Sequence, residues 1–172
     1  MVAEYTVQDD FLPLDLFHSI KSVFLGSGFP WYISDNIIGN REEDPLYGYQ
    51  FTHMLYADKT PQSNFYQVIL PMIEVLNPSA LVKIKANLTP VRSMHYEPGM
   101  HKDVGNFGGY TSVYYINSNN GYTKFSDGTT VNSVENRLVT FKSNQIHTAG
   151  ACTDQRYRCV LNLNYYKWSD DK

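Results

Sequence analysis

The sequence predicts a mainly β domain in which helices at the N-terminus support a sandwich or barrel of short strands. Helical periodicity is confined to residues 1–80. After this point, short segments rich in Val, Tyr, Ile and Thr alternate with clusters of Gly, Asn, Asp and Ser. The length of 172 residues fits one domain. We therefore expect a helical support at 1–80, a β core at 81–166 and a tail at 167–172.

The first helix is predicted over Phe11–Phe24. Its apolar residues recur at the i, i+3, i+4 spacing of a helix with one buried face: Leu14, Phe17, Ile20 and Phe24. Pro13 suits the first turn, because its fixed φ fits a helix and it has no N–H to leave unpaired. Gly26 suits the position just after the last turn.

A second helix is predicted after Thr60, with Thr60 as the N-cap and Pro61 as the first helical residue. Its apolar face comprises Phe65, Val68, Ile69, Met72, Ile73 and Leu76. Pro71 is expected to kink or divide this helix, because proline cannot donate the backbone hydrogen bond. Residues 34–50, between the two helices, are polar, acidic and aperiodic, so we expect mostly loop there.

Strands are expected at Leu81–Leu88, Ser93–Tyr96, Tyr110–Asn117, Tyr122–Phe125, Arg137–Lys142 and Arg158–Tyr166. The last strand alternates between an apolar face (Cys159, Leu161, Leu163, Tyr165) and a face with Arg158, Val160, Asn162 and Asn164. We expect the apolar face to pack on the N-terminal helices and the other face to point into the sandwich. The inward Arg158 would then need a partner, because an unpaired buried charge is very costly.

Charge and composition argue against several classes of protein. The chain has 14 Lys+Arg against 17 Asp+Glu, a net charge of −3, and no basic run of the kind that binds nucleic acid. Its apolar stretches are too short for a membrane helix, and residues 1–5 lack the features of a signal peptide. The two cysteines, Cys152 and Cys159, do not have Cys-x-x-Cys spacing. We expect a cytoplasmic protein that binds neither membrane nor nucleic acid.

Three residues form a candidate metal site. In His101-Lys102-Asp103, the first and third side chains share a face of an extended segment and can bind one ion together. Alone, this triplet fits a surface His–Asp hydrogen bond better. His147 adds a third ligand that can approach across the sandwich. Two histidines and one carboxylate leave coordination positions open, which is typical of non-haem Fe(II) oxygen chemistry and unlike a closed structural zinc site.

Two further residues are candidates for binding an anion. A guanidinium that points into the sandwich, such as that of Arg158, is well suited to hold a ligand carboxylate through two parallel hydrogen bonds. Tyr115 lies on the predicted strand Tyr110–Asn117 and can supply a hydroxyl to the same anion. The alternative for Tyr115 is a core aromatic whose hydroxyl bonds elsewhere.

The chain carries an ordered set of motifs: His101-x-Asp103, Thr111–Asn117 (TSVYYIN), Gly121–Phe125 (GYTKF), Arg137–Phe141 (RLVTF), His147–Gly150 (HTAG) and Arg158–Tyr166 (RCVLNLNYY). Together they resemble the Fe(II)- and 2-oxoglutarate-dependent dioxygenases, in particular the prolyl-4-hydroxylase-like group. The helical N-terminus and the segment Lys83–Leu88 are further similar to small members from marine bacteria and phages. The resemblance extends from about Leu81 to Tyr166. It implies a double-stranded β-helix, a sandwich of the jelly-roll or cupin-like kind.

The resemblance also implies roles for individual residues and for cofactors. The iron ligands would be His101, Asp103 and His147, and the cosubstrate contacts would be Arg158, Tyr115 and Asn162. Arg158 corresponds to the basic residue that pairs with the distal carboxylate of 2-oxoglutarate. The implied cofactor is Fe(II), with 2-oxoglutarate and O2 as cosubstrates and ascorbate as a reductant. The implied reaction hydroxylates a C–H bond and releases succinate and CO2.

The sequence departs from the family pattern in ways that affect these expectations. The spacing from His147 to Arg158 is slightly long, so Arg156 is an alternative for the cosubstrate carboxylate. Gly121-Tyr122 stands where many members have two glycines. The substrate is therefore left as a small molecule, an amino acid or a peptide, including a prolyl residue in a peptide.

Other expectations concern loops and alternative functions. The loops at 34–50 and 104–109 are candidate lids over the site, since Gly105, Gly108 and Gly109 allow the backbone to move. One alternative function is a non-catalytic, metal-containing β-sandwich that serves as a binding module. Another is a zinc hydrolase, for which Glu97 is the nearest carboxylate in sequence that can act as general base.

Overall fold

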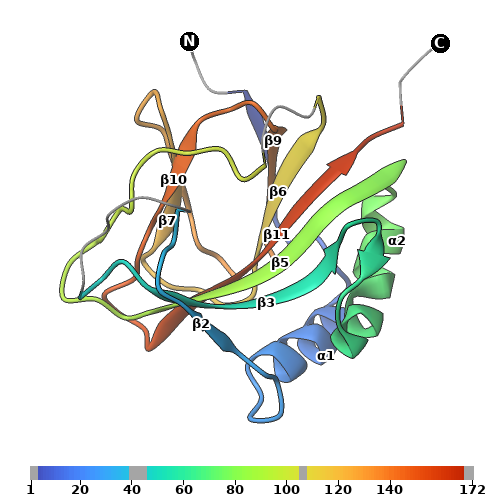
Figure 1. Ribbon diagram of the computed structural model, residues 1–172, viewed down its shortest axis with the longest axis horizontal. Coiled ribbons are helices and arrows are strands. Elements are labelled where there is room, and N and C mark those ends of the chain that lie inside the picture. Colours follow the sequence, from blue (N-terminus) through green and yellow to red (C-terminus); the bar gives the residue numbers. More distant parts are fainter. Residues whose placement is uncertain (1–3, 39–45, 105–107, 169–172) are drawn as a thin grey trace.

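Two antiparallel sheets form the fold in the computed structural model, which describes residues 4–38, 46–104 and 108–168. The larger sheet has the order β1 (Tyr5–Gln8), β9 (Leu138–Lys142), β6 (Tyr110–Tyr115), β11 (Tyr157–Tyr166), β5 (Ala80–Pro90), β3 (Gln50–Ala57) and β2 (Tyr32–Ser34), with β4 (Thr60–Pro61) paired to β3. The smaller sheet has the order β10 (His147–Gly150), β7 (Tyr122–Phe125) and β8 (Thr130–Asn132). This mainly β sandwich confirms the predicted fold class (Figure 1).

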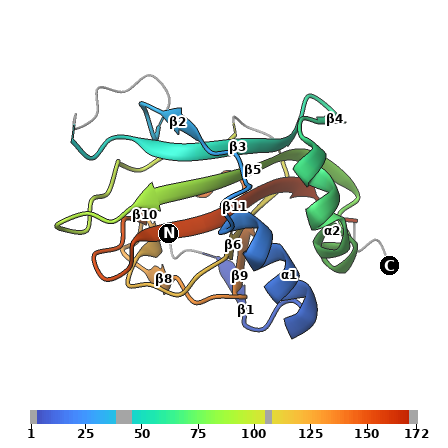
Figure 2. The ribbon, with the colours of Figure 1, turned by 90° about the horizontal axis from the view of Figure 1, so that it is seen from below.

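The helices lie on the face of the larger sheet that points away from β7 and β10 (Figures 1 and 2). Helix α1 (Leu14–Phe24) begins after Pro13, whose carbonyl accepts the N–H of Phe17 at 2.9 Å. Its apolar face is buried as predicted, except that the side chain of Leu14, in the first turn, is 61 % exposed. The predicted first helix is thus confirmed with a later start.

The second predicted helix is divided in two, as Pro71 indicates. A 3₁₀ helix, η1 (Asn64–Ile69), leads into α2 (Leu70–Leu76), and Pro71 lies in the first turn of α2, where its missing N–H costs no hydrogen bond. The predicted N-cap was wrong. Thr60 and Pro61 form β4, and the hydroxyl oxygen of Ser63 accepts the N–H of Phe65 at 3.1 Å instead.

Residues 1–80 are not only helical, because β1 to β4 also come from this part of the chain. The strand β3 was missed because its register shifts between Met54 and Tyr56, and because polar residues, among them the buried His53, break its alternation. The strands β8 and β10, of three and four residues, were also missed. The predicted strand at Ser93–Tyr96 does not form.

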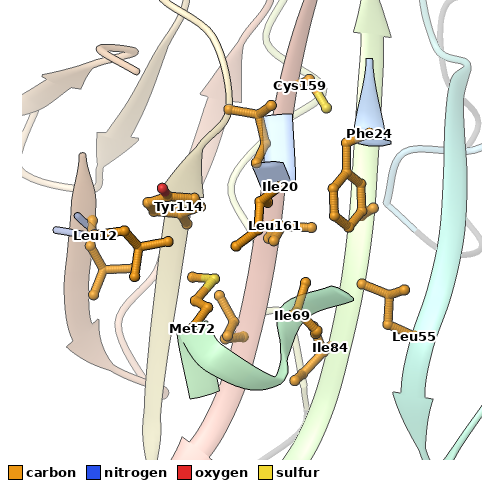
Figure 3. Packing of buried hydrophobic residues seen from close by; sticks show 14 of the residues in the cluster. Leu12, Ile20, Phe24, Leu55, Ile69, Met72, Ile84, Tyr114, Cys159 and Leu161 are labelled. Atoms are coloured by element: carbon orange, nitrogen blue, oxygen red, sulfur yellow. The ribbon is translucent and has the colours of Figure 1, made fainter. Parts of the chain in front are cut away.

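The main core lies between the helices and the outer face of the larger sheet (Figure 3). Ile20 and Phe24 of α1 and Met72 of α2 are fully buried there against Leu161 of β11. The whole apolar face predicted for the last strand takes part in this core: Cys159, Leu161, Leu163 and Tyr165. The prediction that this face packs on the helices is therefore confirmed, and the opposite face of β11 points between the two sheets.

Candidate functional site

A pocket lies between the two sheets and has a volume of about 70 Å³, enough for several waters or one small ligand. Both sheets contribute polar side chains to its wall: Lys85 and Asn87 from β5, Arg158 and Asn162 from β11, and His147 and Thr148 from β10. Because β11 is the central strand between β6 and β5, its inward side chains are held by hydrogen-bonded neighbours on both sides. Strands of both sheets thus form much of the pocket wall.

The structure brings the three predicted metal ligands together in this pocket. His101 and His147 form an isolated β-bridge, in which the N–H of each residue donates to the carbonyl of the other at 2.8 and 3.0 Å. The Oδ1 atom of Asp103 lies 3.6 Å from Nε2 of His101 and 3.8 Å from Nε2 of His147. One ligand atom from each residue lies within 4.8 Å of the others, so a single ion can bind all three.

Backbone carbonyls orient both imidazoles. The carbonyl of Gly99 lies 3.2 Å from Nδ1 of His101, and the carbonyl of Gln145 lies 3.1 Å from Nδ1 of His147. A carbonyl can only accept, so Nδ1 carries the proton in each ring and Nε2 has the free lone pair. Hydrogen bonds of this kind are the usual outer support of metal-binding histidines, because they fix the tautomer and the ring orientation.

Asp103 supplies the negative charge of the cluster. Burial favours the neutral acid, but the adjacent His101 and His147 outweigh it and hold the pKa of Asp103 far below its usual range. The second carboxylate oxygen, Oδ2, is buried and has no hydrogen-bond partner in the described part of the chain. An ionised carboxylate with an unpartnered oxygen, beside two free imidazole lone pairs, fits a divalent cation such as Fe(II).

Metal binding is expected to weaken on acidification, and to do so at a higher pH than in a site whose histidines have ordinary pKa values. Burial opposes protonation of His147, but the adjacent carboxylate of Asp103 prevails and raises the pKa of His147 above its usual value of about 6.5. Coordination needs the neutral ring, so affinity should be full above this raised pKa and fall as the pH decreases through it. Calorimetric titration with Mn(II) over a pH series would measure the effect. An affinity that stays constant from about pH 8 to about pH 6 would contradict it.

Arg158 points into the same pocket and is 4 % exposed. Its Nε donates to Oγ of Ser133 at 3.0 Å and one terminal nitrogen donates to Oγ1 of Thr123 at 3.4 Å, while Tyr115 lies beside it with a ring centroid 5.5 Å from the guanidinium carbon. No carboxylate of the described residues forms an ion pair with it. Burial lowers the pKa of Arg158, so an anionic ligand would relieve an uncompensated buried charge.

The alternative residue, Arg156, is exposed and does not line the pocket. It lies just before β11, whereas Arg158 is on the strand and inside the sandwich. Of the two arginines, Arg158 is therefore the one placed to meet a ligand in the pocket.

The other two predicted cosubstrate contacts lie in different surroundings. Asn162 lines the pocket, and its buried Oδ1 has no hydrogen-bond partner among the described residues. The hydroxyl of Tyr115 donates to Oγ1 of Thr123 at 2.8 Å, and the carbonyl oxygen of Val131 lies 3.4 Å from the same hydroxyl. Tyr115 is fully buried, so it can donate to a ligand only by giving up the bond to Thr123. Its role in cosubstrate binding stays a prediction.

Sequence reasoning missed several polar residues of the pocket. The side-chain oxygens Oδ1 of Asn87 and Oγ1 of Thr148 are buried in its wall without a partner in the described residues. Lys85 also lines it. The signal for β5 was present in the sequence, since Lys85, Asn87 and Thr89 alternate with apolar residues as expected for a strand with one polar, inward face.

Glu97 is not placed as the general base of a hydrolase. Its carboxylate accepts from the hydroxyl of Tyr122 at 2.6 Å and from Nζ of Lys124 at 3.1 Å, and it does not line the pocket. Burial favours its neutral form, but these hydrogen bonds prevail and lower the pKa of Glu97. A carboxylate stabilised in this way is a weaker base than an ordinary one.

The candidate lids fall partly outside the described residues. Of the loop at 34–50, positions 39–45 are not described, and of the loop at 104–109, positions 105–107 are not described. Ile37, within the first loop, and Gln50, at its end, line the pocket.

Comparison with known proteins identifies the fold. No family model matches the chain, and no curated protein matches it in sequence. Solved structures of 2-oxoglutarate- and Fe(II)-dependent oxygenases are similar over nearly the whole chain, so the fold is the double-stranded β-helix of this class. At identities of 9 % to 16 %, the similarity establishes the fold.

Three of these structures illustrate the similarity. A prolyl-4-hydroxylase from Pseudomonas putida has a TM-score of 0.63 at 16 % identity, with 97 % of this chain and 94 % of that chain covered. A viral collagen prolyl hydroxylase from Paramecium Bursaria Chlorella virus-1, in complex with 2-oxoglutarate, has a TM-score of 0.60 at 10 % identity, with 96 % of both chains covered. An oxidoreductase of the 2OG-Fe(II) oxygenase family from Burkholderia pseudomallei has a TM-score of 0.66 at 9 % identity, with 94 % of this chain and 84 % of that chain covered.

In the part of the chain that the structure describes, none of the helices combines the length and the apolar character that crossing a membrane requires.

Proposed function

We propose that the protein is an Fe(II)- and 2-oxoglutarate-dependent dioxygenase that hydroxylates a C–H bond of its substrate. One observation carries the proposal: a cluster of two histidines and one aspartate shares a pocket with the buried Arg158, which forms no ion pair with any described residue. The cluster suits a metal with open coordination positions, and the arginine suits the far carboxylate of a cosubstrate bound to that metal. A non-catalytic binding module would have no use for this guanidinium.

The residues of the pocket have distinct tasks in this mechanism. His101, Asp103 and His147 would hold the metal through two Nε2 atoms and a carboxylate oxygen. Fe(II) with 2-oxoglutarate and O2 supplies the oxidation of the C–H bond, with succinate and CO2 as products. Arg158, itself oriented by Ser133 and Thr123, would hold the distal carboxylate and fix the direction of the cosubstrate. The surrounding walls of the two sheets keep bulk water away from the reacting groups.

The structural neighbours support this proposal and indicate a range of substrates. They include a viral collagen prolyl hydroxylase in complex with 2-oxoglutarate and an epimerase, SnoN, in complex with Fe³⁺ and α-ketoglutarate. A prolyl hydroxylase from Trichoplax adhaerens is in complex with a peptide fragment. We propose an amino acid, a peptide or another small molecule as the substrate, with a prolyl residue of a peptide among the candidates.

Anaerobic titration of the protein with Fe(II) and 2-oxoglutarate tests the proposal. We expect a weak visible charge-transfer band that forms only when both are present, because a metal held by three protein ligands leaves positions for the chelating cosubstrate. Succinate release after O2 is admitted would be measured in the same samples. A protein that binds Fe(II) but gives no band and no affinity for 2-oxoglutarate would contradict the proposed function.

A further inference from the structure

The pocket contains a second cation that the proposed mechanism does not use. Lys85 of β5 lines the pocket, and its side chain makes no hydrogen bond or ion pair with any other residue that the structure describes. Burial lowers the pKa of Lys85, repulsion from Lys83 acts in the same direction, and attraction to Asp103 opposes both. A half-buried lysine without a partner is rare in folded proteins unless a ligand supplies one.

Lys85 and Arg158 occupy different parts of the pocket. Arg158 is paired with Thr89 across β11 and β5, whereas Lys85 is paired with Asn162. The two rungs are four residues apart along the strands, which places their backbones about 13 Å from each other. The charge of Arg158 acts on His147, and that of Lys85 acts on Asp103. The two cations therefore occupy separate positions along the strands that line the pocket.

With the metal ion and 2-oxoglutarate bound as proposed, no negative charge among the described pocket residues is left to balance Lys85. Asp103 is the one carboxylate among the described residues that line the pocket, while Lys85 and Arg158 are both cations. With the proposed ligands bound, Asp103 and the dianion 2-oxoglutarate offset the charges of the metal ion and of Arg158. No carboxylate of the described residues that line the pocket is then left for the ammonium of Lys85, and a group with one negative charge would complete the site.

Hydrogen-bonding groups next to Lys85 indicate which chemical group lies beside the negative charge of the ligand. Asn162 lies directly across from Lys85, and Asn87 follows two residues later on the same face of β5. Both amides have a buried Oδ1 without a partner in the described part of the chain. Buried acceptors of this kind require N–H or O–H donors. A carboxylate adjacent to an N–H, as in an amino acid or the C-terminal residue of a peptide, supplies both.

We propose that Lys85 binds a carboxylate of the substrate, with Asn162 and Asn87 accepting from its neighbouring N–H. This assignment rests on the proposed function, and it narrows the substrate to compounds with a free carboxylate. The same chemistry is present in a free amino acid and in a peptide C-terminus. A peptide recognised only at internal residues lacks it.

Matched acids and amides test the assignment on the anaerobic complex with Fe(II) and 2-oxoglutarate. The probes are L-amino acids with their primary amides, and short peptides with free or amidated C-termini. Binding is measured as a shift of the charge-transfer band and as a rise in melting temperature. We expect at least one acid to bind about tenfold or more tightly than its amide, because a charge-assisted hydrogen bond is lost in the amide. Binding by amino acids alone, or by peptides alone, identifies the source of the carboxylate.

Three variants connect this preference to Lys85. In Lys85→Met, the acid should bind about tenfold more weakly while the amide is unaffected, and Lys85→Arg should retain most of the preference. Lys83→Met is the matched control, because Lys83 lies on the same strand but does not line the pocket. This variant should bind the acids and the amides as the wild type does.

Failure of this assignment can be told apart from failure of the proposed function. If the band forms but no acid in the panel binds better than its amide, or Lys85→Met binds the acids as the wild type does, the role of Lys85 is wrong. If Lys85→Met loses the band itself, Lys85 binds the cosubstrate and the assignment is again wrong. If the band does not form in the wild type, the proposed function fails first.

Discussion

Replacement of Asp103 by alanine is expected to reduce the affinity for Fe(II) more than 100-fold and to abolish succinate formation. Even residues that only support metal ligands change affinity about 10- to 100-fold, and Asp103 supplies a ligand and the negative charge of the cluster. Without it, two neutral imidazoles face the ion, and both lose the neighbour that lies 3.6 and 3.8 Å from their Nε2 atoms. Anaerobic Fe(II) titration and the charge-transfer band would measure the loss.

The control for Asp103→Ala is Glu97→Gln. Glu97 is also partly buried but bonds to Tyr122 and Lys124 outside the pocket. This variant should bind Fe(II) within about twofold of the wild type, as expected for a residue that does not touch the metal. Circular dichroism should show that both variants fold. If Asp103→Ala retains the affinity, or if Glu97→Gln loses activity as fully, the assignment of the site is wrong.

Replacement of Arg158 by methionine is expected to weaken 2-oxoglutarate binding about 30-fold or more, with Fe(II) affinity largely retained. Removing one partner of a buried charge pair costs about 2–5 kcal/mol, because the other charge stays in the pocket unpaired. Methionine fills similar space and lacks the donors that now bond to Ser133 and Thr123. Titration of the anaerobic Fe(II) protein with 2-oxoglutarate, followed by the charge-transfer band, gives the cosubstrate affinity, and a separate anaerobic titration with Fe(II) gives the metal affinity.

Arg156→Met is the matched control, since Arg156 lies two residues earlier and is exposed. It should bind 2-oxoglutarate as the wild type does. The reverse result, a strong loss in Arg156→Met and none in Arg158→Met, would assign the cosubstrate carboxylate to Arg156.

The site was largely predictable because its residues follow from strand geometry. The i, i+2 spacing of His101 and Asp103 indicates a shared face, and the alternation along the last strand indicates that Arg158 points inward. Both inferences use local spacing alone. The meeting of His147 with His101 depends on the topology of the sandwich, so it was indicated by the predicted sandwich and by the ordered family motifs and not by local spacing.

The parts that were not predicted depend on contacts between distant segments. The N-cap of the second helix was predicted at Thr60. A threonine followed by a proline fits a short strand as well as a helix start, and pairing with β3 selects the strand. The strand β3 has little alternation of its own, and its register is set by β5. In the sequence, Lys85 is indistinguishable from a lysine on an exposed strand face. The face of β5 that carries it lines the pocket only because the smaller sheet lies opposite.

The bridge between His101 and His147 has a consequence for the stability of the fold. An ion bound to both side chains ties together positions that are far apart in the sequence, in the way that a disulfide closes a loop. The free energy of binding then adds to the free energy of unfolding, by an amount that grows with the concentration of free ion. Removal of the ion by a chelator would loosen the attachment of the 101–103 segment to β10. The apparent melting temperature of a preparation is therefore expected to depend on its metal content.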